Sequence, residues 1–210
     1  MRIILRKIRG KITPALLGAA ALAAVAGCGR GSQTVVPPQA IVRLSDQFAS
    51  DFALIDQTGA ARTDEEFRGR VAVVYFGFAT CPDVCPLALG TLSAALNELT
   101  ERERAGLAPL FITVDPERDT PDALKAYLAF DERLIGLTGS AEAAAAARAG
   151  FKVYAKRAPL PDSALGYTMD HTSLFYIVDR DGRPRLAVHD SVNAAELAAV
   201  LRQSLKGRLG

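Results

Sequence analysis

The chain alternates between short uncharged apolar runs and longer segments in which apolar residues recur every three or four positions. Apolar runs rich in Val, Ile and Phe are typical of buried strands, and the helical period is typical of helices packed on a sheet. The predicted strands are residues 52–55, 60–63, 71–79, 107–114, 134–137, 151–155, 172–178 and 185–188. The predicted helices are residues 86–104, 121–130, 141–149 and 193–205, with one helical turn at 64–68.

This order of strands and helices predicts an α/β fold, in which a central sheet with parallel crossovers is flanked by helices on both faces. The first two strands, joined by a turn at 56–59, predict an added N-terminal β-hairpin. Residues 156–170 contain two prolines and a glycine and show no apolar period. A loop of this length in a compact domain is typical of a functional lid.

The first eleven residues carry five basic side chains and no acidic one, and an uncharged run follows at residues 12–27. This layout is typical of a secretory signal, and the run is shorter than the roughly 20 residues that span a membrane. The sequence Val-Ala-Gly-Cys at its end resembles a bacterial lipobox. We therefore predict a lipoprotein-type signal peptide at 1–27, lipid attachment at Cys28, a flexible tether at 28–44 and one domain at 45–208. The alternative is an uncleaved membrane anchor, and both place the domain outside the cytoplasm.

Charge and composition exclude a nucleic-acid-binding surface. The formal net charge of the chain is +2, and loss of the five basic residues of the leader leaves −3. No basic stripe with interleaved aromatic residues is present, and Trp is absent.

The segment 71–86 ends a charge-free strand at two cysteines, Cys81 and Cys85, just before the next helix begins. The exposed N–H groups at a helix N-terminus favour a thiolate over a thiol. A thiolate pair is either a redox-active disulfide or a soft metal site. A structural disulfide is the alternative, although so short a loop gains little stability from closure.

Copper(I) prefers thiolate and imidazole ligands, so two cysteines and one histidine form an adequate site. His171 follows the predicted lid and can face the cysteine loop if its strand lies beside the central one, whereas His189 is expected to be an ordinary surface residue. Zinc is disfavoured because a closed zinc site needs a fourth ligand. Asp170 adjoins the histidine and Asp83 lies between the cysteines, so both are candidates for orienting a ligand or contacting a partner.

Four sequence blocks resemble the signature segments of the Sco family, also called SenC. They are FGFATCPDVCP at 76–86, TVDPERDTP at 113–121, LIGLTGS at 134–140 and YTMDHTSLFYIVDRDG at 167–182. The resemblance covers residues 48–206 and implies a thioredoxin-like fold that binds one copper through Cys81, Cys85 and His171. It also implies a membrane-tethered protein that assembles the copper centre of cytochrome c oxidase. Ala79 stands where threonine is common, which leaves the ligands unchanged.

Two functions compete. The first is a copper chaperone that delivers copper to the oxidase subunit carrying the copper centre, served by a copper donor and a thiol reductant outside the cytoplasm. The second is a thiol-disulfide oxidoreductase that reduces the cysteines of that subunit before metallation. A peroxidase ranks last, because no threonine stands three residues before either cysteine. The expected location is the periplasmic side of a bacterial cell envelope.

Overall fold

The computed structural model describes Thr34 and residues 36–208. The predicted signal peptide and Cys28 lie outside these described residues. Within the described part of the chain, no helix combines the length and the apolar character needed to cross a membrane.

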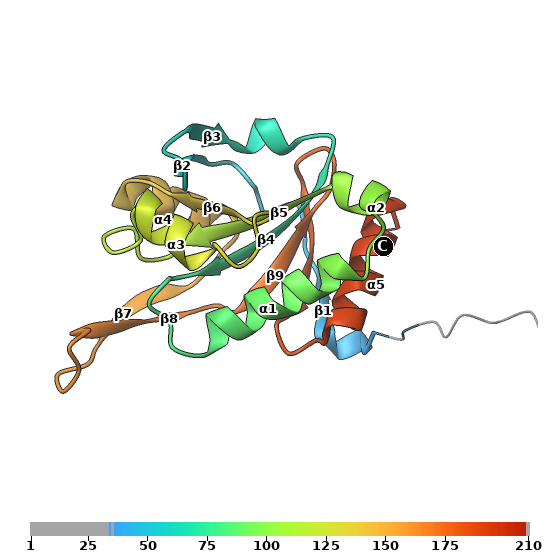
Figure 1. Ribbon diagram of the computed structural model, residues 1–210. Coiled ribbons are helices and arrows are strands. Elements are labelled where there is room, and N and C mark those ends of the chain that lie inside the picture. Colours follow the sequence, from blue (N-terminus) through green and yellow to red (C-terminus); the bar gives the residue numbers. More distant parts are fainter. Residues whose placement is uncertain (1–33, 35, 209–210) are drawn as a thin grey trace, which may run out of the picture. The chain divides into compact units, whose positions relative to one another are not determined.

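An eight-stranded sheet forms the centre of the domain (Figure 1), with strand order β1-β10-β9-β4-β5-β6-β2-β3. The neighbouring pairs β4-β5 and β5-β6 are parallel, and the other pairs in the sheet are antiparallel. The strands are β1 (Ile41–Arg43), β2 (Ala53–Asp56), β3 (Ala61–Thr63), β4 (Val71–Gly77), β5 (Leu107–Thr113), β6 (Ile135–Thr138), β9 (Leu174–Val178) and β10 (Pro184–His189). The parallel crossovers and the added hairpin, β2-β3, are confirmed.

Helices cover both faces of the sheet, as predicted. Side chains alternate along β4, so Gly77 approaches Cys85 on one face, whereas the ring of Phe76 meets that of Phe151 on the other. Helix α1 packs along α5 on the first face, and Phe151 directly follows α4. The α-helices are α1 (Val84–Asn97), α2 (Glu101–Ala105), α3 (Pro121–Tyr127), α4 (Ala141–Gly150) and α5 (Ala194–Leu205). Two 3-10 turns complete the set, η1 (Pro38–Ala40) and η2 (Asp64–Phe67).

The single helix predicted at 86–104 is wrong, because the chain forms two helices there. Helix α1 ends at Asn97, and Thr100 starts α2 as a reciprocal cap: its side chain accepts from the Glu103 N–H, and Glu103 accepts from the Thr100 N–H at 2.9 Å. This capping box starts a second helix directly after Leu99, the last residue of the leucine period. Helix α1 also begins two residues earlier than predicted.

The loop predicted at 156–170 and the strand predicted at 151–155 are also wrong. Phe151 is fully buried after α4, and the chain then forms a two-stranded antiparallel hairpin, β7 (Ala155–Pro159) and β8 (Tyr167–His171), separate from the main sheet. Figure 1 shows this hairpin projecting from the domain. The residues of its arms are partly buried or exposed, so they lack the apolar alternation by which a buried strand is recognised. Only the tip at 160–166 is irregular.

The end of the predicted tether belongs to the sheet. Residues 38–43 form η1 and β1, and β1 pairs with β10 through Ile41, Val42 and Arg43. The boundary predicted at residue 45 therefore lies too far along the chain. A strand of three residues on a sheet edge is too short to be read from its pattern.

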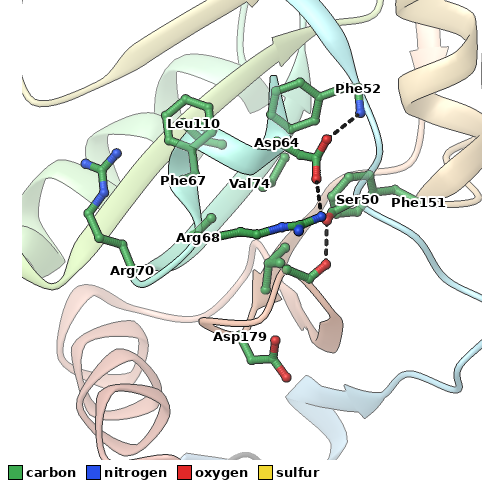
Figure 2. A pocket seen from close by; sticks show the side chains of 13 residues that line it. Ser50, Phe52, Asp64, Phe67, Arg68, Arg70, Val74, Leu110, Phe151 and Asp179 are labelled. Atoms are coloured by element: carbon green, nitrogen blue, oxygen red, sulfur yellow. Dashed lines mark hydrogen bonds and ion pairs between the residues drawn. The ribbon is translucent and has the colours of Figure 1, made fainter. Parts of the chain in front are cut away.

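A cavity lies near the amino-terminal end of β4, at the end of that strand away from the cysteines (Figure 2). Its walls are the aromatic rings of Phe52, Phe67 and Phe151 and the side chains of β4. Its polar rim is internally paired: Asp64 accepts from the Phe52 N–H and binds Arg68, both at 3.5 Å. None of its lining residues is a cysteine or a histidine. Two of them, Asp64 and Phe67, belong to η2, so the cavity lies in the packing beneath that turn.

Candidate metal centre

The two cysteines lie where the buried strand β4 passes into α1. Residues 71–77 of β4 are all buried, so the chain reaches the surface directly after the strand. Cys81 lies in the connecting loop and is partly exposed, whereas Cys85 is the second residue of α1 and fully buried. The Cys85 N–H donates to the Cys81 sulfur at 3.5 Å. The predicted position of the pair at a helix N-terminus is therefore confirmed.

His171 is the last residue of β8, and its ring lies against the buried thiol. The Nε2 atom is 3.5 Å from the Cys85 Sγ, and Nδ1 is 2.9 Å from the carbonyl oxygen of Thr172. That carbonyl can only accept, so Nδ1 carries the hydrogen and Nε2 has a free lone pair on the sulfur side. The prediction that His171 faces the cysteine loop is confirmed, because β9 pairs with β4.

Aromatic rings fix the histidine from two sides. The rings of Phe78 and Tyr75 both meet the imidazole edge-on, with centroid distances of 5.7 and 6.5 Å. The Tyr75 hydroxyl in turn lies 2.6 Å from the Ser173 hydroxyl. His171 therefore occupies a defined position over the cysteine loop.

The two thiols have opposite ionisation. A hydrogen bond from the Cys85 thiol is the main cause that lowers the pKa of Cys81 to about 4, and the backbone N–H groups of Cys85 and Asp83 contribute further. The same hydrogen bond, together with burial, raises the pKa of Cys85. At neutral pH the metal-free site thus holds an accessible thiolate beside a buried thiol.

A buried carboxylate that the sequence did not reveal holds the cysteine loop in place. The Asp119 carboxylate accepts the Ala79 N–H at 3.1 and 3.2 Å and the Thr113 hydroxyl at 2.6 Å. Asp115 lies just after β5 and Asp119 just before α3, and both are buried. No local pattern could identify Asp119, since its partner Ala79 lies 40 positions away in sequence.

The candidate carboxylates Asp83 and Asp170 lie at the rim. Both are exposed and line a shallow pocket together with Cys81 and His171. Asp170 precedes His171 in an extended strand, so its side chain points to the opposite face of β8. Their roles remain predictions. His189 lies at the exposed end of β10 and lines a different pocket.

The donor set fits a soft, thiophilic metal ion. The Cys85 N–H contacts the Cys81 sulfur, the Cys85 sulfur contacts the His171 Nε2 atom, and the second ring nitrogen is held by a backbone carbonyl. Copper(I) accepts such a set of three ligands, whereas magnesium and calcium require oxygen ligands.

Fold and site together define a thioredoxin-like protein that carries a thiol pair and a histidine at the end of its central strand. The chain belongs to the SCO1/SenC family, which matches residues 42–206. This confirms the family indicated by the four sequence blocks.

Similar proteins agree with this family assignment. The chain is 38% identical over 138 residues to the SCO2-like protein of Rickettsia felis, covering 65% of this chain and 67% of that protein. It is 39% identical over 158 residues to the mitochondrial SCO2 homologue of Danio rerio, covering 74% of this chain and 56% of that protein. The structure of Bradyrhizobium japonicum ScoI with copper bound is 39% identical, with a TM-score of 0.69, over 75% of this chain and 99% of that one.

Proposed function

We propose that this protein is a copper chaperone, which binds one copper ion through Cys81, Cys85 and His171 and delivers it to the copper centre of cytochrome c oxidase. The observation that carries the proposal is the approach of the free His171 Nε2 to within 3.5 Å of the Cys85 sulfur. The similar ScoI structure contains copper, and the family resemblance implies the oxidase as the acceptor.

The site suits a cargo ion better than a permanent cofactor. Cys81 is partly exposed and lies at the edge of the shallow pocket, so an incoming ligand from an acceptor can reach the ion from solvent. Three ligands leave copper(I) open to a further donor, which permits transfer by ligand exchange. Asp83 and Asp170 are both exposed near the site, and we propose that they contact an acceptor that covers this end of the hairpin.

The cellular setting that we propose is extracytoplasmic. A lipid on Cys28 would anchor the domain to the membrane, on the periplasmic side of a bacterial envelope, where the acceptor subunit exposes its copper centre. In this oxidising compartment a thiol reductant must keep the Cys81-Cys85 pair open, and a separate donor must supply copper.

The proposal is tested by copper(I) stoichiometry on the reduced protein from Thr34 onward, which forms one compact unit. The wild type should bind one equivalent, and Cys81→Ala and Cys85→Ala should each lose it. His189→Ala is the matched control and should retain it. A full equivalent bound by both cysteine variants would refute the thiolate site.

The opposite ionisation of the two thiols supports a second candidate, a thiol-disulfide oxidoreductase. The Cys81 thiolate would attack a disulfide of the oxidase subunit and release one thiolate of the target. Cys85, after losing its proton, would then attack the mixed disulfide, which leaves a Cys81-Cys85 disulfide and a reduced target. This role uses the same two sulfur atoms and does not need the imidazole as a ligand.

The two proposed functions predict different effects of replacing His171. His171→Ala should weaken copper binding by on the order of 10-fold or more. If reduction is the main role, the variant should keep the rate of disulfide reduction within a few-fold of wild type. A copper chaperone instead predicts that the variant fails to metallate the acceptor in a transfer assay, even when the acceptor is supplied fully reduced.

A further inference from the structure

The β7-β8 hairpin carries His171 and has its own attachment to the domain. Its strands pair only with each other, so the main sheet does not fix it. Within residues 36–208, the side chains that join the hairpin arms to the rest of the domain by hydrogen bonds or ion pairs are Arg157, Tyr167 and His171.

Tyr167 makes the most extensive of these attachments. Its hydroxyl donates to the buried Asp115 carboxylate at 2.9 Å, and its carbonyl oxygen accepts from the Arg118 guanidinium at 3.0 Å. The ring lies between two guanidinium groups, 3.8 Å from that of Arg118 and 4.0 Å from that of Arg157. We call these four residues the tyrosine clamp.

The clamp is itself fixed to the domain. Arg118 also binds Asp115, which is 2% exposed at the end of β5, and Arg157 forms an ion pair with Glu117 at 2.7 Å. A guanidinium group stacks favourably on an aromatic ring, and a buried carboxylate is destabilised when its hydrogen-bond partner is removed. Tyr167 is therefore attached by several contacts that act together.

Two routes connect the clamp to the histidine. Tyr167 precedes His171 by four residues in β8, so both side chains project from the same face of the strand. Met169, between them, packs against the core from that face. On the second route, the Arg118 guanidinium lies 5.9 Å from the ring of Phe78, and that ring meets His171 edge-on.

We propose that Tyr167 is a positioning residue, which through Asp115 and Arg118 holds β8 so that His171 lies over the two cysteines. The inference rests on the proposed function, because it assigns Tyr167 a role in the affinity for copper. It adds that the hairpin and the cysteine loop are fastened to one shared anchor, the segment between β5 and α3.

The first test measures how readily the β7-β8 hairpin opens in the absence of copper. Backbone amide hydrogen exchange on the full, reduced, metal-free chain should show faster exchange in β8 of Tyr167→Leu, on the order of 10-fold, with unchanged exchange in β4. Tyr154→Leu is the control, since this exposed tyrosine lies just before β7 and outside the clamp. Unchanged exchange in β8 would overturn the proposal, whatever the protein does with copper.

The second test asks whether the clamp acts through the histidine. Tyr167→Leu should weaken copper(I) binding by on the order of 10-fold, but should have no further effect in a His171→Ala background. Equal weakening in both backgrounds would overturn the positioning role. If Tyr167→Leu does not fold, Tyr167→Phe, which removes only the bond to Asp115, and Arg118→Lys, which removes the planar stack, carry the same tests.

A different result would show that the proposed copper site, rather than the role of Tyr167, is wrong. Copper affinity that does not depend on His171 in the otherwise unaltered protein would refute the three-ligand site, while the exchange measurement would still decide whether Tyr167 holds the hairpin.

Discussion

At the scale of single residues, the chemistry depends on one hydrogen bond between two thiols. Cys85 is fully buried, and its thiol donates a hydrogen bond to the partly exposed Cys81. Burial disfavours charge on Cys85, and the donated hydrogen bond favours it on Cys81. The metal-free protein thus holds Cys81 as a thiolate, which can bind a metal or attack a disulfide, and Cys85 as a protonated thiol.

Thiol reactivity tests this asymmetry. The pKa of Cys81 is lowered to about 4, so its thiolate is present throughout the range above that value and is lost only as the pH falls through it. Alkylation of the reduced, metal-free protein by iodoacetamide should therefore modify Cys81 at a rate almost constant from pH 6 to pH 9, as read by mass spectrometry. A rate that climbs about tenfold per pH unit over this range would show an ordinary thiol.

Asp119 supplies a second test at this scale. Asp119→Ala leaves the Ala79 N–H and the Thr113 hydroxyl without their partner, which should lower the free energy of unfolding by about 2 kcal/mol. Urea denaturation of the reduced protein measures this change. A loss below about 0.5 kcal/mol would show that the carboxylate does not hold the loop.

The ionisation of Asp119 adds a pH dependence. Burial raises its pKa from 3.8 to about 6, so between these values the folded protein retains a proton that the unfolded chain releases. This carboxyl therefore makes the free energy of unfolding fall as the pH rises from about 4 to about 6. Asp119→Asn should remove this component, and an identical slope in the variant would contradict the assignment.

The sequence was sufficient to single out the two cysteines and the histidine that the structure brings together, but not the residues that position them. Cys81, Cys85 and His171 belong to residue types with few roles outside metal and redox chemistry, so their context was informative. Asp119 and Tyr167 act through partners 40 and 52 positions away. Carboxylates and tyrosines are common at strand ends, and such long-range pairing leaves no local pattern.

At the scale of elements, the site depends on how closely β4 approaches α1. A Cβ atom on Gly77 would lie 2.9 Å from the Cys85 sulfur and 2.8 Å from the ring of Phe111. A glycine is therefore required where the last residue of the strand passes beneath the helix.

Gly77→Ala should consequently displace Cys85 and lower the free energy of unfolding by about 1–3 kcal/mol, the usual cost of overpacking. Gly90→Ala is the matched control, because Gly90 lies within α1 with no atom near its Cβ position and should stabilise the helix by up to about 1 kcal/mol. Denaturant unfolding of both variants gives the comparison. Equal stability of Gly77→Ala and wild type would contradict the close approach.

Most elements could be predicted because their apolar period is strong. The errors fall where that period does not determine the structure. The leucine period of α1 runs to Leu99, directly before the capping box at Thr100, so it does not mark the end of α1 at Asn97. The β7-β8 hairpin has polar arms held by the tyrosine clamp and by its own ladder, so its sequence resembles that of a loop.

At the scale of the whole molecule, the sheet extends further toward the N-terminus than the composition indicated. Strand β1 covers the outer edge of β10, and an uncovered edge offers unpaired backbone groups to other chains. Strand β1, which lies within the predicted tether, is therefore part of the folded domain.

Truncation tests this role. A protein that begins at Leu44 lacks β1 and should be less stable than one that begins at Thr34, by about 2 kcal/mol for the loss of a few backbone hydrogen bonds. It should also aggregate more readily. Thermal unfolding and light scattering make the comparison, and equal stability of the two proteins would show that β1 contributes nothing to the fold.

The central claim is that three side chains from two distant segments form one copper site. An anaerobic copper(I) competition titration of the reduced protein tests it most directly, with wild type, His171→Ala and His189→Ala compared side by side. The account predicts one tight equivalent in wild type and His189→Ala, and binding weakened by on the order of 10-fold or more in His171→Ala. Equal binding by all three proteins, or negligible binding by wild type, would contradict it and favour the oxidoreductase.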